Sequence, residues 1–113
     1  MAMTTIQQLL TTAEEEVMLK LWELKNAAIV ELIPLYSSPR PAYNTVSTFI
    51  RILEKKGVVG HEKKGRGFIY FPLITKEEYR KYLLERLLIN YYKNDTRAIN
   101  SEINQMKKLD QLL

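Results

Sequence analysis

The amino-acid pattern changes abruptly at Gly57, and this change constrains the fold more than any other feature of the chain. Before it, apolar residues recur at helical spacing. After it, two short runs rich in β-forming residues, 58–64 and 67–73, flank a Lys-Gly-Arg-Gly turn, which is typical of a hairpin. A two-stranded hairpin is only marginally stable in water by itself. The sequence therefore predicts a hairpin packed against a helical core.

Two helices are predicted near the N-terminus. The first covers about residues 12–25, with Thr12 as its N-cap and Glu15 as the capping-box partner three residues later. The second is shorter and ends near Pro34, because proline disfavours the helical conformation of the residue before it. A loop, "SSPRP", follows these two helices.

A third helix is predicted over "PAYNTVSTFIRILEKKG", residues 41–57, and its two faces differ in chemistry. Asn44 or a near neighbour is the expected N-cap, and Gly57 is the expected stop. The face expected to be buried is apolar: Val46, Ile50 and Leu53. The opposite face carries short hydrogen-bonding side chains, poor helix formers, and one cation: Asn44, Thr45, Ser47, Thr48 and Arg51.

Two more helices are predicted after the hairpin. One covers about residues 75–92, with Thr75 and Glu78 as its capping box, and the other covers residues 98–113, after a break at residues 94–95. Both carry apolar stripes that exceed what a small core needs to cover, which favours pairing with a second copy of the chain. The candidate dimerisation residues are Tyr79, Leu83, Leu87, Tyr91, Ile99, Ile103 and Met106, and the last stripe continues through Leu109 and Leu113.

The order helix, helix, helix, hairpin predicts a mainly α protein with a small β-hairpin, a winged helix-turn-helix. We expect residues 1–74 to form this domain and residues 75–113 to form a C-terminal helical dimerisation region.

Composition excludes several classes of function. There is no cysteine and one histidine, His61, so disulfides, thiolate sites and familiar zinc sites are excluded. The glutamates at residues 14–16 fit the first turn of a helix. We therefore expect no enzyme, no metal and no cofactor. With no export signal and no run of the roughly 20 apolar residues that span a bilayer, the chain is expected to be cytoplasmic, without membrane insertion.

The polar face of the third helix suits the DNA major groove, which a recognition helix enters with its N-terminal residues facing base edges. Asn44 is equally well placed to pair with adenine or to cap the helix, and Arg51 can reach guanine or a phosphate. Threonine offers hydrogen bonds and a methyl group for thymine.

Positive charge is concentrated around this helix and the hairpin. Residues 40–66 hold seven basic and two acidic residues, a local net charge of +5 against +4 for the whole chain. Contacts to phosphates favour such a concentration. The candidate DNA-binding residues are Arg40, Tyr43, Asn44, Thr45, Ser47, Thr48, Arg51, Lys55, Lys63, Lys64 and Arg66.

The segments "TTAEEEVMLKLWEL" and "PAYNTVSTFIRILEKKGVVGHEKKGRGFIYFPLITKEEY" resemble the penicillinase-repressor (BlaI/MecI-type) family of bacterial regulators, over about residues 10–90. The resemblance implies a homodimeric winged-helix repressor of an inverted-repeat operator, with its C-terminal helices at the dimer interface and its wing at residues 63–67. It maps the base contacts onto Thr45, Ser47 and Thr48, with Asn44 and Arg51 as neighbours.

The resemblance also implies a membrane sensor protease as a partner. Better-known relatives are cleaved at an Asn–Phe bond in the dimerisation region, and copper-responsive relatives carry a C-terminal cysteine cluster. This chain has neither feature, so the resemblance does not identify its inducing signal.

Two other functions fit the same residues. One is a winged-helix module that docks an acidic protein on its basic face, since fold alone does not fix function. The other is an architectural DNA binder without sequence preference, recognisable by steep salt dependence and little discrimination.

Overall fold

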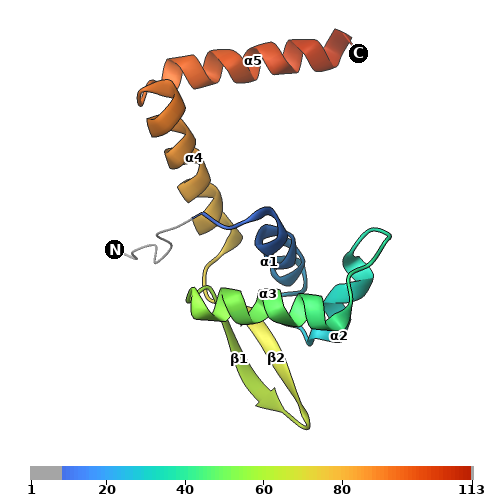
Figure 1. Ribbon diagram of the computed structural model, residues 1–113. Helices are drawn as coiled ribbons and strands as arrows, with labels where there is room; N and C mark the ends of the chain where they lie inside the picture. The colour runs from blue at the N-terminus through green and yellow to red at the C-terminus, as the bar shows by residue number, and fades with distance from the viewer. Residues whose placement is uncertain (1–8, 113) are drawn as a thin grey trace. The chain divides into compact units, whose positions relative to one another are not determined.

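The computed structural model describes residues 9–112, with side chains described as far as residue 109. The chain forms two compact units that divide after Tyr79. The predicted order of three helices, a hairpin and two helices is confirmed (Figure 1). The elements are α1 (Thr12–Leu24), α2 (Ile29–Leu32), the 3₁₀ helix η1 (Ile33–Leu35), α3 (Tyr43–Lys55), β1 (Val59–Lys64), β2 (Gly67–Pro72), α4 (Lys76–Tyr92) and α5 (Thr96–Leu112).

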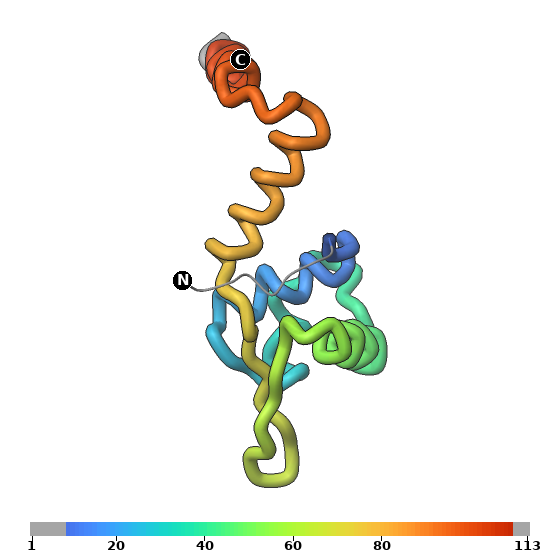
Figure 2. The backbone as a smooth tube through the Cα atoms, turned by 90° about the vertical axis from the view of Figure 1, so that its left-hand side faces the viewer, coloured from blue at the N-terminus to red at the C-terminus, as the bar shows by residue number. Residues whose placement is uncertain are grey.

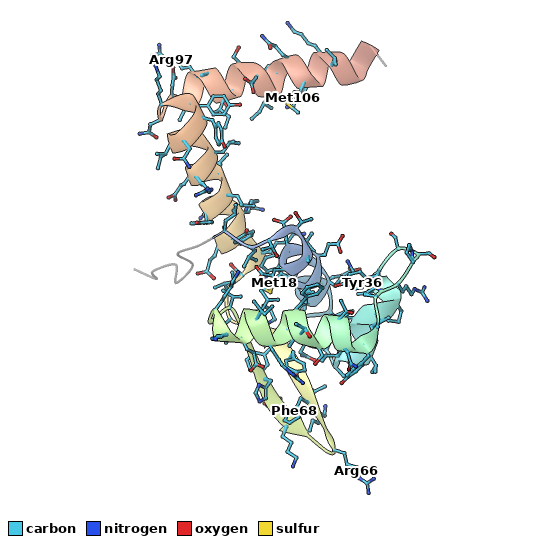
Figure 3. The ribbon with its side chains drawn as sticks, viewed as in Figure 1. Met18, Tyr36, Arg66, Phe68, Arg97 and Met106 are labelled. Carbon is cyan, nitrogen blue, oxygen red and sulfur yellow. The ribbon has the colours of Figure 1, made fainter. Side chains whose placement is uncertain are left out.

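Apolar side chains of α1, α2 and α3 form the core of the first unit. Its largest fully buried side chains are Met18, Leu21, Leu32, Ile50, Leu53, Val17 and Val46, and Figure 3 marks Met18 among them. The predicted apolar face of the third helix is therefore confirmed. Burying such side chains contributes about 1.5–3 kcal/mol each, which is the main term that holds three short helices together.

The N-cap of α1 is Thr11, so the predicted capping box of Thr12 and Glu15 is wrong by one residue. The Thr11 hydroxyl accepts a hydrogen bond from the Glu14 N–H (3.2 Å), and the Glu14 carboxylate accepts one from the Thr11 N–H (2.9 Å). Both Thr–Glu pairs satisfy the sequence rule. Tertiary packing selects between them, because Glu14 is buried and bonds Lys56 beyond the end of α3.

Helix α3 begins without a capping side chain. Its N-cap is Ala42, a near neighbour of Asn44 as the sequence allowed, so Asn44 lies inside the first turn and does not itself cap the helix. The predicted stop is confirmed, since Gly57 has φ +81° and the Val58 N–H donates back to the Leu53 carbonyl at 3.1 Å. This left-handed ending is the one that glycine adopts without strain.

The predicted hairpin is confirmed: β1 and β2 pair antiparallel, from Val59 with Pro72 to Lys64 with Gly67. Its base joins the helical core through buried Val59 and through a two-way backbone pair between Ala27 and Tyr70 (2.9 and 2.8 Å). Figure 2 shows the hairpin extending away from the three helices toward its turn. The fold therefore supplies a rigid base with an exposed tip.

Helix α4 starts in the first unit and continues into the second. Thr75 and Glu78 form the predicted capping box, with bonds of 2.8 and 3.0 Å. The predicted break is confirmed, since Lys93 and Asn94 have positive φ, and α5 begins at Thr96, two residues before the predicted start. Leu113, the last residue of the predicted stripe, lies outside the described residues.

The second unit is tied internally by a side-chain contact between its two helices. The Tyr92 hydroxyl of α4 donates a hydrogen bond to the Glu102 carboxylate of α5, and this bond raises the pKa of Tyr92. None of the helices described here is long and apolar enough to cross a membrane.

Candidate nucleic-acid interface

One exposed stripe runs along α3, and we call it the α3 stripe. Its members are spaced by four, three and four residues, which places side chains on one helix face. The α3 stripe consists of Asn44, Thr48, Arg51 and Lys55, all exposed. Thr45 is exposed beside it. The structure thus brings most of the predicted recognition residues onto one surface.

Ser47 is the exception among the predicted base-reading residues. Its side of the helix faces the core, and the residue is only 8% exposed, next to fully buried Val46. The expectation that Ser47 faces solvent with the other polar residues is therefore wrong. The reason is geometric: position 47 lies at the edge of the buried face formed by Val46, Ile50 and Leu53, rather than opposite it.

The α3 stripe keeps part of its hydrogen-bonding capacity available for a partner. The Thr48 hydroxyl donates to the Asn44 carbonyl at 2.9 Å, which leaves its lone pairs and its methyl group available. Asn44 does not cap the helix, so its exposed amide can both donate and accept, as adenine recognition requires.

The turn of the hairpin carries three predicted cations, Lys63, Lys64 and Arg66, which we call the wing tip. All three are exposed, and Figure 3 shows Arg66 at the extremity of the hairpin, directed away from the helices. Gly65 has φ +63°, the left-handed conformation that this tight turn needs. Arg40 is likewise exposed, in the loop that precedes α3.

Lys56 lies in the same basic region but has a structural partner. Its Nζ bonds the Glu14 Oε1 at 2.7 Å, and Glu14 is buried. Burial raises the pKa of the Glu14 carboxyl, but the hydrogen bonds from Lys56 and Thr11 and the charge of Lys56 outweigh it, so the pKa of Glu14 is lowered. This ion pair holds the start of α1 against the end of α3 and removes Lys56 from the cations free to meet phosphates.

A hollow of about 560 Å³ lies between the start of α2, the start of α3 and the hairpin. Two exposed aromatic rings, Tyr43 and Phe68, and two wing-tip cations, Lys64 and Arg66, line it. Phe68 was not among the sequence candidates, because an apolar residue in a strand ordinarily indicates a buried face. Its exposure next to cations suits it to the apolar sugar edge of a nucleic-acid backbone.

His61 is exposed on β1 and contacts the Glu54 carboxylate of α3 through its Nδ1. Its ring also meets Phe68 edge-on, with centroids 5.1 Å apart, and lies 5.7 Å from the Tyr70 ring. The pKa of Tyr70 is raised, mainly by burial and further by the nearby Glu54 and Tyr43. The positive charge of Arg51 lowers the pKa of Tyr70 and so partly offsets these effects. Among the residues described, no cluster of three potential metal ligands exists.

The predicted dimerisation residues fall into two groups. Leu87, Tyr91, Ile103 and Met106 are exposed, and Leu83 is half-buried. Leu84, Ile89 and Leu109 are exposed with them. Of these three, only Leu109 belongs to an apolar stripe predicted from the sequence.

Tyr79 and Ile99 do not belong to a free interface, and that part of the prediction is wrong. Tyr79 is 2% exposed, its ring lies 6.0 Å from Trp22, and its hydroxyl accepts the Leu10 N–H at 3.0 Å. Ile99 is 9% exposed. Both residues belong to the apolar stripes by their spacing in the sequence, but other parts of the same chain bury them.

Comparison with known proteins gives consistent matches. The family model described as penicillinase repressor matches residues 10–112. The penicillinase repressor of Bacillus licheniformis is 30% identical over 104 residues, covering 91% of this chain and 79% of the relative.

Two solved structures resemble the chain. The solution structure of the DNA-binding domain of the repressor BlaI has a TM-score of 0.54 at 35% identity, over 62% of this chain and 87% of that one. The monomeric form of Bacillus licheniformis BlaI in complex with the blaP half-operator has a TM-score of 0.53 at 33% identity, over 64% and 89%. With the α3 stripe and the wing tip in place on this fold, the chain belongs to the penicillinase repressor family, and its first unit is a winged helix-turn-helix.

Proposed function

We propose that this chain is a transcriptional repressor that binds an inverted-repeat DNA operator as a homodimer. The observation that carries the proposal is the α3 stripe next to the wing tip: exposed hydrogen-bonding side chains flanked by exposed cations. Base edges are read by the first kind of group, and phosphates are held by the second. The Bacillus licheniformis relative solved with its half-operator supports the same use of this fold.

The two surfaces have separate tasks in this proposal. Helix α3 enters the major groove, where Asn44, Thr45 and Thr48 contact base edges and Arg51 reaches a guanine or a phosphate. Arg40, Lys55 and the wing tip contact the backbone and supply affinity that depends on salt. Tyr43 and Phe68 face the sugar edge of the strand between the two surfaces.

Dimerisation is proposed through exposed apolar residues of the second unit. An isolated unit of this size seldom buries enough apolar surface to be stable alone, and association with another copy is a common remedy. The residues proposed for the interface are Leu83, Leu84, Leu87, Ile89, Tyr91, Ile103, Met106 and Leu109. Linking two weak half-site contacts raises overall affinity by about 10²–10⁴-fold, and the half-sites should lie about one helical turn or a small multiple apart.

A repressor of this kind acts where the chromosome is, so we propose a cytoplasmic site of action in a bacterial cell. Repression would follow from occlusion, because a dimer that covers two half-sites excludes polymerase from the same stretch of DNA.

The test is selection of bound duplexes from a random DNA pool at about 150 mM salt, where non-specific binding is weakened. Enrichment of an inverted repeat is the expected result, and the repeat gives the operator for every later measurement. Enrichment of a single half-site would contradict the dimer, and failure to enrich any sequence would contradict sequence-specific binding altogether.

The same experiment separates the two other functions that fit the sequence. An architectural binder would retain DNA without enriching a sequence and would lose it steeply with salt. A docking module for an acidic protein would retain no duplex at this salt concentration.

A further inference from the structure

The outer part of the hairpin has little support from the rest of the first unit. Only its base is packed, through Val59 and the backbone pair of Ala27 and Tyr70. From His61 to Phe68 every residue is exposed. An isolated two-stranded hairpin is only marginally stable, so the position of the wing tip depends on the contacts that hold the hairpin to the helices.

Within the described part of the chain, one side-chain hydrogen bond joins α3 to the hairpin: Glu54 with His61. It lies at the outer edge of the base, because His61 pairs with Tyr70 across the sheet. Glu54 lies near the end of α3, between the stripe residues Arg51 and Lys55, and its side chain is 27% exposed. His61 lies two residues before Lys63, the first residue of the wing tip. The contact is therefore placed between the base-reading surface and the phosphate-holding surface.

The same histidine joins the two strands of the hairpin. His61 is paired with Tyr70 in the register of the sheet, and its ring also packs edge-on against Phe68 of β2. A restraint on His61 therefore acts on both strands and on the turn between them.

Glu54 would otherwise be an unfavourable residue at this place. An unpaired carboxylate beside the α3 stripe would face DNA phosphates of the same charge, and like charges repel. Contact with His61 directs the Glu54 carboxylate toward the hairpin.

We propose that Glu54 and His61 are positioning residues that fix the wing tip relative to α3, so that Arg66 and its neighbours reach the DNA backbone while α3 lies in the major groove. This inference rests on the proposed function. In this inference Glu54 and His61 contact no base. The contribution of Arg66 to DNA affinity depends on the contact between them.

The test is a double-mutant cycle, which measures whether two side chains act through each other. Binding to the selected operator is measured for the full chain, for Arg66→Ala, for Glu54→Ala and for the double variant. Arg66→Ala alone should weaken binding about tenfold and lower the salt slope by about one. In the Glu54→Ala background the same change should cost less than about twofold and leave the slope unchanged.

Glu62→Ala is the matched control. Glu62 is an exposed carboxylate on β1, directly after His61, so its removal deletes the same charge without touching the contact. Arg66→Ala should still cost about tenfold in this background.

His61→Ala removes the contact from the hairpin side and should reproduce the effect of Glu54→Ala. Both side chains are partly exposed, and thermal unfolding of each variant checks that the fold persists. If Glu54→Ala does not fold, the double-mutant cycle is measured with His61→Ala in its place.

Equal costs of Arg66→Ala in all backgrounds would overturn the inference and leave the proposed function intact. Absence of any preference for the operator in the unsubstituted chain would overturn both.

Discussion

At the scale of single residues, the exposed side of α3 separates groups that can read bases from groups that can hold phosphates. Asn44 and Thr48 are short and end in hydrogen-bonding atoms, whereas Arg51 and Lys55 carry their charge on long side chains further along the helix. Hydrogen bonds to base edges discriminate between sequences, whereas phosphate contacts add affinity to all of them. Substitutions should therefore cause two distinct kinds of loss.

Thr48→Ala should reduce discrimination at one base step of the operator by roughly 1–3 kcal/mol, because it removes a hydroxyl and a methyl group that face the groove in the proposed complex. Arg66→Ala should instead weaken binding to operator and to unrelated DNA alike. Competition binding with operator duplexes changed one base pair at a time measures both effects.

Ser47→Ala is the control for this experiment. Because Ser47 is almost wholly buried, its loss should change the affinity for every duplex by less than about twofold. A base-specific effect of Ser47→Ala, or a uniform loss from Thr48→Ala, would contradict the assignment of the reading face.

Glu14 is a buried residue whose charge affects folding of the first unit. Its pKa in the folded chain is lowered below the usual value near 4.5. A lowered pKa means that the stabilisation from Glu14 is fully present above the unfolded pKa and is lost as the pH falls through the folded pKa.

Glu14→Gln should therefore destabilise the chain at neutral pH and have little effect in acid. We expect about 1–2 kcal/mol at pH 7, since glutamine can still bond the Thr11 N–H but cannot pair with the charge of Lys56. Denaturant unfolding at pH 7 and near pH 3 measures the difference. Glu15→Gln, at a half-buried neighbour on the same turn, serves as the control. A pH-independent cost at Glu14 would contradict the ion-pair account.

At the scale of secondary-structure elements, the sequence was sufficient to predict the helices, the hairpin and a break at about residues 94–95, because each has a local cause. Periodicity of apolar residues predicts the helices, and glycine with polar residues predicts the turns. The same holds for the exposed surface at Asn44, Thr48 and Arg51, which lies opposite a clear apolar face.

The errors in prediction occur where two local solutions are equally good or where distant parts meet. Thr11 and Thr12 can both head a capping box, and the choice depends on Lys56, which is remote in sequence. The contact of Glu54 with His61 likewise depends on how the hairpin docks. Tyr79 belongs to an apolar stripe in the sequence, but Leu10 and Trp22 contact it and it is buried.

Gly57→Ala tests the ending of α3. Its φ of +81° is unfavourable for a side chain, although an added Cβ would have nothing within 4 Å. The expected cost is therefore backbone strain alone, about 1 kcal/mol, read from the midpoint of denaturant unfolding. Gly67→Ala should be nearly neutral, because that glycine lacks positive φ and also has open space. Equal costs at both positions would contradict the argument.

At the scale of the whole molecule, the proposed function divides DNA contact and self-association between the two units. The proposed operator needs both: α3 and the wing for each half-site, and the second unit to link two copies. This division makes the two activities separable by substitution.

Leu87→Asp should produce a folded monomer that binds a half-site as well as the unsubstituted chain but binds the full operator at least 10²-fold more weakly. Sedimentation and binding to the two duplexes test this. Leu19→Asp, at a leucine of the first unit with the same 42% exposure, should leave the dimer intact. Dimers that persist in Leu87→Asp would place the interface on Ile103, Met106 and Leu109 instead.

The burial of Tyr79 has a consequence for how such chains can be cut and recombined. Because the opening turn of α4 completes the core of the first unit, a fragment that ends at residue 74 uncovers Trp22 and Leu10, whereas one that extends beyond residue 79 keeps them covered. The junction between the two units is thus a point within a helix and not a linker. A different C-terminal arm grafted onto the first unit would therefore have to retain the opening turn of α4 through Tyr79.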